Sequence, residues 1–436
     1  MKKLALHWQI LLGMAAGVIF ALLMTNFSWG AEFIGDWIKP FGNIFINALK
    51  LIAVPLILAS LIKGISDLKD ISKLSKMGTR TILIYITTTV IAVSIGLGMV
   101  NLIKPGSAIS EDTRNELIAS YEGDASVRIA DAAKQKEAGP LQALEDLVPS
   151  NIFAAAGDNS NMLQVIFFAI FFGVGLILIP EETAKPVKAF FDGFNEVILK
   201  LIDIIMLTAP YGVFALLAAL VVESPSADLF QALAMYAVTV LIGLLLMIGV
   251  YILIVWVFTG RTPAFFENGI APAQLLAFST SSSAATLPVT MERVEEHMGV
   301  EEEVASFVLP IGATINMDGT SLYQAVAAVF IAQAFGMDLS LSAQLGIIAT
   351  ATLASIGSAA VPGAGMVMLV IVLAQAGIPE AGLALIFAVD RPLDMCRTTV
   401  NVTGDAAVSM MVAKSVDKLG EPHVKDWDDN LSAENR

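Results

Sequence analysis

The stretch IGATINMDGTSLYQ, Ile311–Gln324, places an asparagine and an aspartate inside a segment that is otherwise apolar enough to lie in lipid. Its polar side chains fall at every second residue, at Thr314, Asn316, Asp318 and Thr320. One helical face would show spacings of three and four, so we expect the helix to unwind around residues 316–318. Unwinding frees main-chain carbonyls beside hard oxygen ligands, which suits a small dehydrated cation. The alternative is an ion pair, but 304–334 contains no Lys or Arg.

The whole chain is strongly apolar. Of its 436 residues, 56% are hydrophobic and 15% are charged, unlike an ordinary soluble domain. Apolar windows of roughly 17 to 25 residues, the length that a helix needs to cross a bilayer, recur from one end to the other. We therefore predict an all-α membrane protein with about eight transmembrane helices in the lipid bilayer. The net charge of -15 argues against nucleic acid as a partner.

The chain offers eight candidate spans. We expect them at 8–25, 41–62, 80–102, 148–180, 190–222, 229–258, 304–334 and 380–413. The first resembles a signal peptide, but many spans follow it, so we expect a retained helix. The link after the second span carries the densest basic cluster, Lys63, Lys69, Lys73, Lys76 and Arg80. Positive charge favours the cytoplasmic side, which puts both termini inside.

Three further features bear on the organisation of the chain. The acid-rich stretch 105–147 is expected outside the membrane, as a solvated linker without chemistry. The single cysteine, Cys396, excludes an internal disulfide. The three histidines are too scattered in sequence to indicate a metal cluster.

Two segments, 271–290 and 349–375, are only partly apolar and are broken by small residues and proline. Such backbone persists at membrane depth only where protein or a water-filled cavity satisfies its polar groups. We predict two re-entrant helical hairpins. Their tips share a Ser-Ala-Ala triplet followed by proline, at 283–288 and 358–362. Hairpin plus span, twice, is typical of transporters built from inverted repeats, although so short a match also arises by chance.

The last span carries a stripe of polar and charged residues. Asp390, Asp394, Arg397, Asn401 and Asp405 follow one another at spacings of four, three, four and four, which places them on one helical face. Ionisable residues inside a membrane are costly and usually mark a substrate or ion path. An acid for an ammonium, an arginine fork for a carboxylate and an amide together complement an acidic amino acid. The alternative is an ion pair of Asp394 with Arg397 that only stabilises the bundle.

Other polar clusters are less specific. The tip STSSSAATLP offers hydroxyls and helix-end N–H groups to an anion. The tip GSAAVPGAG has the backbone freedom to approach a ligand and to move, so it is the better candidate for a gate. Tyr85, Thr87, Thr88 and Thr89 form an uncharged cluster, which alone indicates helix packing.

Four motifs in this order, SSSAATLP, NMDGT, VPGAG and DMCRTTVNVTGD, resemble those of the dicarboxylate/amino acid:cation symporter family, the glutamate and aspartate transporters and their prokaryotic homologues. The likeness spans nearly the whole chain. It implies a homotrimer in the cytoplasmic (inner) membrane of a prokaryote. Scaffold domains would hold moving transport domains that carry substrate and sodium across as elevators.

The resemblance also implies a division of the chain. Residues 1–79 and 148–228 would belong to the scaffold, 80–104 and 229–415 to the transport domain, 105–147 to an external loop and 416–436 to a cytoplasmic tail.

By the same resemblance, particular residues would form the binding sites. Substrate would be surrounded by Ser281, Ser282, Ser283, Thr320, Val361, Pro362, Gly363, Ala364, Gly365, Asp394, Arg397, Thr398 and Asn401. Sodium would be held by Gly312, Asn316, Asn401 and Asp405; by Thr314, Ser355, Ile356 and Ser358; and by Tyr85, Thr88, Thr89 and Asp318.

The chain departs from the family pattern in places. Gln324 stands where animal members carry a proton-binding glutamate, which argues against proton and potassium coupling by that route. Ser281 and Met395 occupy the two positions where members carry a second arginine, and Arg391, one turn before Met395, is the candidate replacement for that charge. The neutral amino acid branch of the family lacks an arginine at the position of Arg397, and the C4-dicarboxylate branch lacks an aspartate at the position of Asp394; this chain has both.

We therefore expect a sodium-coupled symporter for aspartate or glutamate, and not an enzyme. The nearest alternative is a proton-coupled glutamate or C4-dicarboxylate symporter. An intramembrane hydrolase using Asp318 with Asp405, or Ser282, fits poorly, because the chain lacks the Gly-x-Gly-Asp and Gly-x-Ser-Gly motifs and a histidine base in its hydrophobic core. A passive channel is the third alternative.

Overall fold

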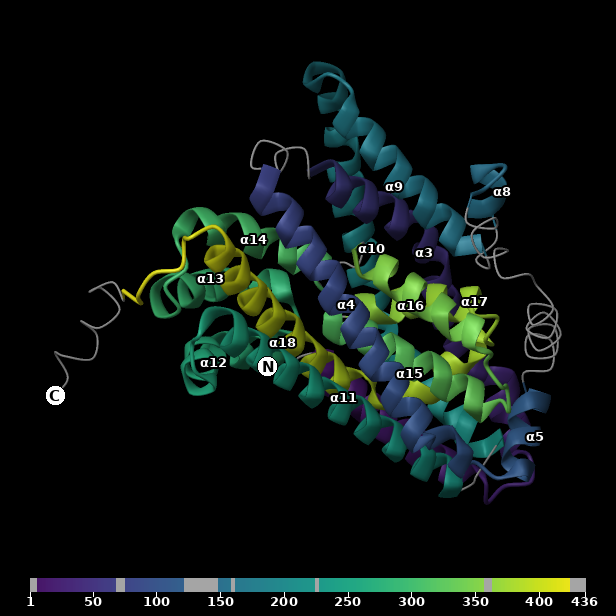
Figure 1. Ribbon diagram of the computed structural model, residues 1–436. Coiled ribbons are helices and arrows are strands. Elements are labelled where there is room, and N and C mark those ends of the chain that lie inside the picture. The colour runs from purple at the N-terminus through teal and green to yellow at the C-terminus, as the bar shows by residue number, and fades with distance from the viewer. Residues whose placement is uncertain are drawn as a thin grey trace, which may run out of the picture.

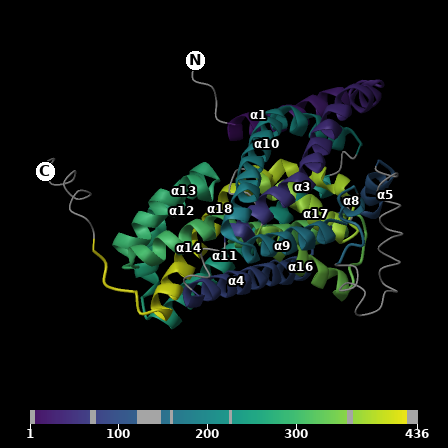
Figure 2. The same ribbon diagram turned by 90° about the horizontal axis from the view of Figure 1, so that it is seen from above.

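The computed structural model describes residues 6–67, 75–120, 148–157, 161–223, 227–356 and 363–423, and within these ranges it is helical without a β-strand (Figures 1 and 2). A helix satisfies its backbone hydrogen bonds within its own segment, which lipid requires of a chain this apolar. The prediction of an all-α membrane protein agrees with this architecture.

The first half of the chain forms several long helices joined by short helical segments. They are α1 (Leu6–Met24), α2 (Gly30–Phe33), the π-helical η1 (Ile34–Ile38), α3 (Lys39–Asp67), α4 (Ser75–Ile103), the 3-10 helix η3 (Pro105–Ala108), α5 (Glu111–Ser120), α8 (Ile152–Ala156), α9 (Met162–Leu178), α10 (Glu181–Glu223) and α11 (Ala227–Thr259).

The second half is more interrupted. It contains α12 (Pro263–Thr280), α13 (Ser283–Glu292), the π-helical η5 (Arg293–His297), α14 (Glu302–Ile315), α15 (Asp318–Ala334), α16 (Leu341–Ile356), α17 (Ala364–Gln375), the 3-10 helix η6 (Glu380–Gly382) and α18 (Leu383–Ser415).

Four helical stretches in the described ranges are long and apolar enough to cross a membrane: Gly30–Ser66, Met77–Ala108, Glu181–Val222 and Asp228–Thr259. The first runs from α2 through η1 into α3, the second runs through α4 into η3, and the other two lie in α10 and α11. The predicted number of about eight transmembrane helices is larger than four because the other predicted spans are short, interrupted or charged. The apolar parts of α1 and α9 are shorter, the predicted span 304–334 is divided into α14 and α15, and α18 carries the charged stripe. The count of eight remains a prediction.

One detail of the predicted layout is wrong. The predicted span 148–180 is divided into α8 and α9, with residues 158–160 outside the described ranges. The first part of the segment 105–147 forms η3 and α5, while its place outside the membrane stays a prediction. The Oδ2 atom of Asp228, at the start of α11, accepts hydrogen bonds from Ser110 N at 2.9 Å and Thr113 Oγ1 at 3.2 Å, which tie this segment to the bundle.

The unwinding predicted inside 304–334 is present, between α14 and α15. Asn316 and Met317 leave helical geometry, with φ/ψ of -90/89° and -115/47°. Asp318 itself lies in the first turn of α15, so the break is shorter than predicted. Ser355 satisfies the freed backbone, because its Oγ donates to Ile315 O at 3.1 Å and accepts from Met317 N at 3.2 Å.

Broken helix pairs lie where the two hairpins were predicted. The pair α12 and α13 is separated at Ser281, which adopts a left-handed φ of 52°. The pair α16 and α17 makes mutual contacts, and its predicted tip, residues 357–362, lies outside the described ranges. The similarity of the two tips therefore remains a prediction.

The helices contact one another in two sets. In one set, α3 and α10 pack together, α1 packs on α10, and α9 packs on α3. In the other, α18 is in contact with α4, α11, α12, α14 and α15 (Figures 1 and 2). The sets meet mainly where α17 packs on α3 and α18 packs on α10.

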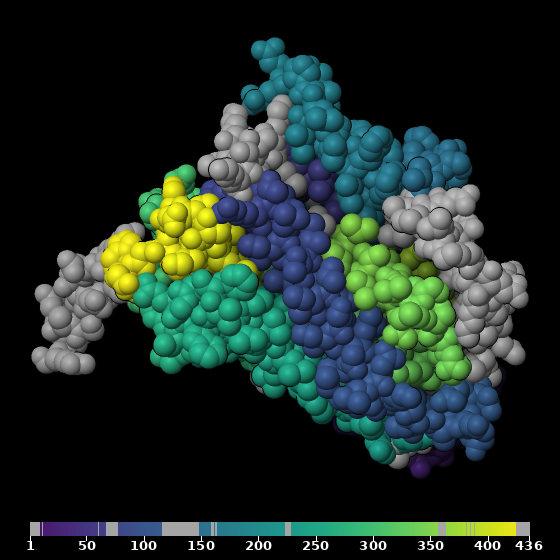
Figure 3. Space-filling view, in the orientation of Figure 1, coloured from purple at the N-terminus to yellow at the C-terminus, as the bar shows by residue number. Residues whose placement is uncertain are grey.

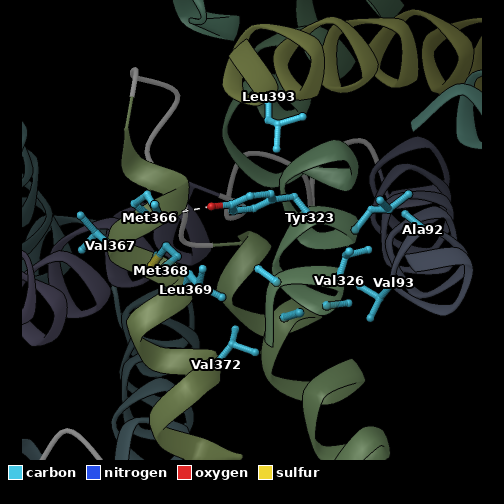
Figure 4. Close-up of a cluster of buried hydrophobic side chains, with 14 of the residues drawn as sticks. Ala92, Val93, Tyr323, Val326, Met366, Val367, Met368, Leu369, Val372 and Leu393 are labelled. Atoms are coloured by element: carbon cyan, nitrogen blue, oxygen red, sulfur yellow. Dashed lines mark hydrogen bonds between the residues drawn. The ribbon is translucent and has the colours of Figure 1, made fainter. Parts of the chain in front are cut away.

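Tyr323 lies at the core of the second set. Its ring extends from α15 toward α17, and its Oη donates to Met366 Sδ at 3.2 Å (Figure 4). Leu369 and Leu393 approach it from α17 and α18 (Figure 4). This packing holds α17 beside α15 and thereby positions the residues that follow Gly363.

Candidate substrate and cation site

Arg397 is the central residue of the charged stripe on α18 and is completely buried. Its Nη1 donates to Asp390 Oδ1 at 2.8 Å, and its Nη2 donates to Asp394 Oδ1 at 2.8 Å. The guanidinium also stacks on the ring of Tyr323, with Cζ 3.8 Å from the ring centroid. Its Nε is buried without a hydrogen-bond partner. The ion pair of Asp394 with Arg397, which was the alternative to a substrate site, is therefore present, and Asp390 extends it.

Arg391 lies on the other side of Asp394. Its Nη1 donates to Asp394 Oδ2 at 3.1 Å, and Gly363 N donates to the same oxygen at 3.3 Å. Both oxygens of Asp394 are thus engaged, one by each arginine. The expectation that Arg391 replaces the missing second arginine stays a prediction, and this contact supports it.

Several other predicted substrate residues gather around Arg397. Thr320, Ala364, Gly365 and Thr398 are all buried. A Cβ placed on Gly365 would lie 3.0 Å from Thr320 Cγ2 and 3.7 Å from Arg397 Nη2, so the start of α17 closely approaches both. Thr398 Oγ1 donates to the backbone oxygen of Asp394 at 2.9 Å. Val361 and Pro362 lie outside the described residues.

The tip of the first hairpin is not joined to this cluster. Ser281, Ser282 and Ser283 are buried, but within the described ranges no hydrogen bond links them to Arg397 or Asp394. Ser282 caps α13, since its Oγ accepts from Ala285 N at 3.2 Å. The buried Oγ of Ser281 has no partner. A substrate role for this tip stays a prediction.

Asn401 connects the Arg397 cluster with the break between α14 and α15. Its Oδ1 accepts from Gly319 N at 2.8 Å, and its Nδ2 donates to Thr320 Oγ1 at 3.3 Å. Its backbone oxygen accepts from Asn316 Nδ2 at 3.3 Å. Gly319 permits this arrangement, because a Cβ there would overlap the backbone oxygen of Arg397.

Asp405 lies two helical turns beyond Arg397, next to the broken helix. Its Oδ1 accepts from Asn316 Nδ2 at 2.9 Å, while Asn316 Oδ1 is buried without a partner. A Cβ on Gly312 would overlap both Asp405 Oδ1 and Tyr85 Oη, so the backbone of α14 lies directly against these oxygens. Four predicted sodium ligands, Gly312, Asn316, Asn401 and Asp405, are therefore brought together.

Asp318 lies in a second, neighbouring oxygen-rich cluster and is completely buried. Thr89 Oγ1 donates to its Oδ1 at 2.5 Å, and the Oη of Tyr251 donates to its Oδ2. Thr88 Oγ1 donates to Tyr85 O at 3.0 Å, and Thr89 Oγ1 lies 2.8 Å from the same oxygen. The predicted set of Tyr85, Thr88, Thr89 and Asp318 is thus assembled between α4 and α15.

The remaining predicted set is only partly assembled. Ser355 reaches the helix break, as described above, but Thr314 Oγ1 bonds within its own helix, to Pro310 O at 3.3 Å. Nothing is described for the side chain of Ile356 or for Ser358. This third set of ligands stays a prediction.

The electrostatic situation of Asp318 and Asp405 is unusual. Both are buried, and within the described ranges neither forms an ion pair with Lys, Arg or His. An unpaired buried carboxylate is unfavourable unless a counter-charge or a proton compensates it. Neutral hydroxyl, amide and carbonyl oxygens surround both groups, and hard cations prefer such ligands. Among the described residues, no group of three or more His, Cys, Asp or Glu side chains is arranged so that it could hold a metal ion.

Sequence reasoning missed two residues of these clusters. Tyr251 on α11 is 67 positions from Asp318 in the sequence. The one sequence signal for this contact was a tyrosine hydroxyl inside an apolar helix, which needs a buried hydrogen-bond partner. Tyr323 lies one turn after Thr320, a position that placed it on the same face of α15.

A narrow cavity between α1, α10 and α18 reaches the Arg397 cluster, and it is lined by Met206, Gly363, Asp390 and Asp394 among others. Gly363 has a φ of +82°, and a Cβ there would lie 2.8 Å from Met206 Sδ. The start of α17 therefore lies tightly against α10 beside the cluster.

A bundle of apolar helices with interrupted helices and buried charges at its centre defines a membrane transporter. The family model for the sodium:dicarboxylate symporter family matches residues 6–415, and the chain belongs to this family. The resemblance drawn from the four motifs is confirmed.

Named relatives come from bacteria and animals. The chain is 33% identical to the proton/sodium-glutamate symport protein of Geobacillus stearothermophilus, over 98% of each chain. It is 33% identical to the proton/glutamate-aspartate symporter of Escherichia coli (strain K12), over 94% of this chain and 93% of the relative. Identity to excitatory amino acid transporter 2 of Rattus norvegicus is 35%, over 84% of this chain and 71% of the relative.

Proposed function

We propose that this protein is a sodium-coupled symporter that imports aspartate or glutamate across the inner membrane of a prokaryote. The names of its relatives refer to glutamate, aspartate and excitatory amino acids. Arg397 supplies a planar fork for a side-chain carboxylate, and Asp394 supplies a partner for the ammonium group. Because both are now engaged with each other, substrate binding must replace existing contacts.

The observation that carries the proposal is the position of Asn401. Its side chain contacts Thr320 and Gly319 in the Arg397 cluster, and its backbone oxygen contacts Asn316, which in turn binds Asp405. A cation at Asp405 and a substrate at Arg397 would therefore both favour one position of the Asn401 side chain and backbone. Such a shared residue couples two binding events, and by linkage each ligand then promotes the other's binding.

Transport by an elevator mechanism fits the two contacting sets of helices. The set of α1, α3, α9 and α10 would be the scaffold of a homotrimer, and the set around α18 would be the transport domain. The two helix pairs would be re-entrant hairpins, with eight spans and both termini in the cytoplasm. The pair α16 and α17 would be the gate, because α17 begins beside Arg397 and Asp394.

Proton coupling is the alternative, and two relatives with proton in their names favour it. A proton on Asp318 or Asp405 would neutralise a buried carboxylate as a cation does. Gln324 cannot titrate; its Nε2 donates to Gly365 O at 3.3 Å.

Uptake of radiolabelled aspartate into proteoliposomes tests the proposal. A sodium gradient, a lithium gradient and a pH gradient would each be imposed as the sole driving force. We expect accumulation above equilibrium with the sodium gradient alone. Accumulation with the pH gradient alone would select the proton-coupled alternative, whereas equilibration without accumulation would indicate a channel.

A further inference from the structure

A second polar cavity lies far from Arg397, at the ends of α4 and α15 and the start of α5. Its volume is about 410 Å³, within the range of small-molecule sites. Lys104, Arg114 and Asp338 line it together with the amides of Asn101, Gln333 and Gln344. In Figure 3 the blue surface of α4 runs beside the light-green surface of α16. On α15, Thr320 is near one end and Gln333 near the other, roughly 20 Å apart at the rise of a helix.

The three charged groups of this cavity are not engaged with one another. Within the described ranges, no ion pair or side-chain hydrogen bond involves Lys104 Nζ, the Arg114 guanidinium or the Asp338 carboxylate. The Nε atom of Arg114 is buried and has no partner at all. The cavity thus presents two cationic groups and one anionic group. A buried polar atom without a partner is costly and calls for an explanation, of which a ligand is one.

The walls of the cavity are held in place by their own hydrogen bonds. Asn101 Nδ2 donates to Gln344 Oε1 at 2.9 Å, which joins α4 to α16. Gln333 accepts from Gly106 N at 3.1 Å and donates to Val100 O at 3.3 Å, which joins α15 to α4 and η3. These contacts fix the frame and leave the charged groups free.

Gly336 positions the arginine. It has a φ of +69°, and a Cβ there would lie 2.9 Å from Arg114 Cδ, so only glycine lets the arginine stem cross the end of α15. The guanidinium is thereby directed by packing rather than by a charged partner. Preorganisation of this kind lowers the cost of binding a ligand.

We propose that this cavity is a second binding site for a free acidic amino acid, separate from the Arg397 cluster. Two carboxylates would bind Arg114 and Lys104, and the ammonium group would bind Asp338. The single net negative charge of aspartate or glutamate matches the single net positive charge of the three side chains. The choice of an amino acid rests on the proposed function, whereas the complementarity to small carboxylates rests on the cavity alone.

Equilibrium binding of radiolabelled aspartate to the full-length protein in phosphatidylcholine nanodiscs, with sodium, tests the proposal. We expect two classes of site in the wild type, one tight and one weak. Arg114→Gln and Lys104→Gln should each raise the dissociation constant of the weak class by about tenfold or more, because a charge-assisted hydrogen bond is lost. Both variants should keep the tight class, and Lys200→Gln, on the exposed face of α10, should change neither class.

Two further variants sharpen the assignment. Arg397→Cys should lose the tight class and retain the weak one. Asp338→Asn should weaken aspartate at the weak class, but it should not weaken succinate, which has no ammonium group and is measured by displacement.

A wild type with the tight class of site and without the weak class would overturn the proposal and leave the proposed function standing. A weak class that is unchanged in both Arg114→Gln and Lys104→Gln would also overturn it. Absence of the tight class from the wild type would instead contradict the proposed function. The response of the weak class to Arg114→Gln and Lys104→Gln would still show whether aspartate binds in the cavity.

Discussion

At the scale of single residues, the state of Arg397 decides how a substrate can bind. Both Nη groups are held by carboxylates, Asp390 and Asp394, so the cluster in this conformation supplies its own counter-charge. A dicarboxylic amino acid would replace one intramolecular carboxylate with its own and offer its ammonium to the carboxylate released. An acidic amino acid can make this exchange with its side-chain carboxylate and keep its main-chain carboxylate for other partners, whereas an amino acid with a neutral side chain has no second carboxylate to offer Arg397.

Arg397→Cys is therefore expected to lose affinity for acidic amino acids and to admit small neutral ones such as serine. Breaking one side of a buried charge pair costs about 3 to 5 kcal/mol, which corresponds to a loss of aspartate affinity of about a hundredfold or more. Binding of labelled aspartate and serine to the purified protein measures this. Lys200→Cys, on an exposed residue, is the matched control.

The Arg397→Cys protein must first be monodisperse and must still bind sodium, because loss of folding would imitate loss of affinity. If such a protein took up aspartate with near wild-type affinity, Arg397 would be a structural ion-pair partner, and the substrate assignment would fail.

Asp405→Asn is expected to weaken sodium binding while the protein stays folded, because a hard cation loses a charged ligand. By linkage, sodium must then promote aspartate binding less strongly. Aspartate binding measured over a range of sodium concentrations gives both quantities. Asp203→Asn on the exposed side of α10 is the control, and an unaltered sodium dependence in Asp405→Asn would remove Asp405 from the site.

At the scale of helices, sequence periodicity predicted what lies within one segment and missed what lies between segments. The spacing of two in the opening stretch identified the break at Asn316 and Met317, and the spacing of three and four placed Asp394, Arg397 and Asn401 on one face of α18. The contact between Tyr251 and Asp318 depends on the packing of α11 against α15, for which a single sequence holds no periodic signal.

The same limit applies to the segment 105–147. Its acid-rich composition indicated a solvated linker, but η3 and α5 are held by Asp228, more than a hundred residues later in the chain. Composition reports average polarity, and it does not report a specific tertiary contact.

The start of α17 differs from the tip of the first hairpin in how tightly it is packed. Gly363 has a left-handed φ and lies against Met206 on α10, whereas Ala284 is exposed. Gly363→Val is therefore expected to slow or abolish aspartate uptake, while Ala284→Val has little effect, because a β-branched residue at positive φ is strained and clashes. Initial uptake rates in proteoliposomes, normalised to the amount of folded protein, make the comparison. Equal losses at both positions would leave no reason to assign the gate to α17.

At the scale of the whole molecule, an elevator requires α18 to move relative to α3. Phe45 on α3 and Phe387 on α18 face each other with ring centroids 5.2 Å apart, across the boundary between the two sets of helices. Phe172 on α9 and Phe191 on α10 are 5.5 Å apart within the proposed scaffold. The two pairs have the same chemistry and similar spacing, and they differ in whether transport must separate them.

Cysteine pairs at these positions, in a background with Cys396→Ser to remove the single native thiol, test that motion. Bridging Phe45→Cys to Phe387→Cys with a mercuric ion should arrest aspartate uptake, and excess dithiothreitol should restore it. Bridging Phe172→Cys to Phe191→Cys should leave uptake near its unbridged rate, because no relative movement is needed there. Loss of free thiols, measured on the same samples, shows that each bridge has formed. If the bridged α3–α18 pair still transported, or if both pairs stopped transport equally, α18 would not travel past α3, and the elevator would have to be abandoned.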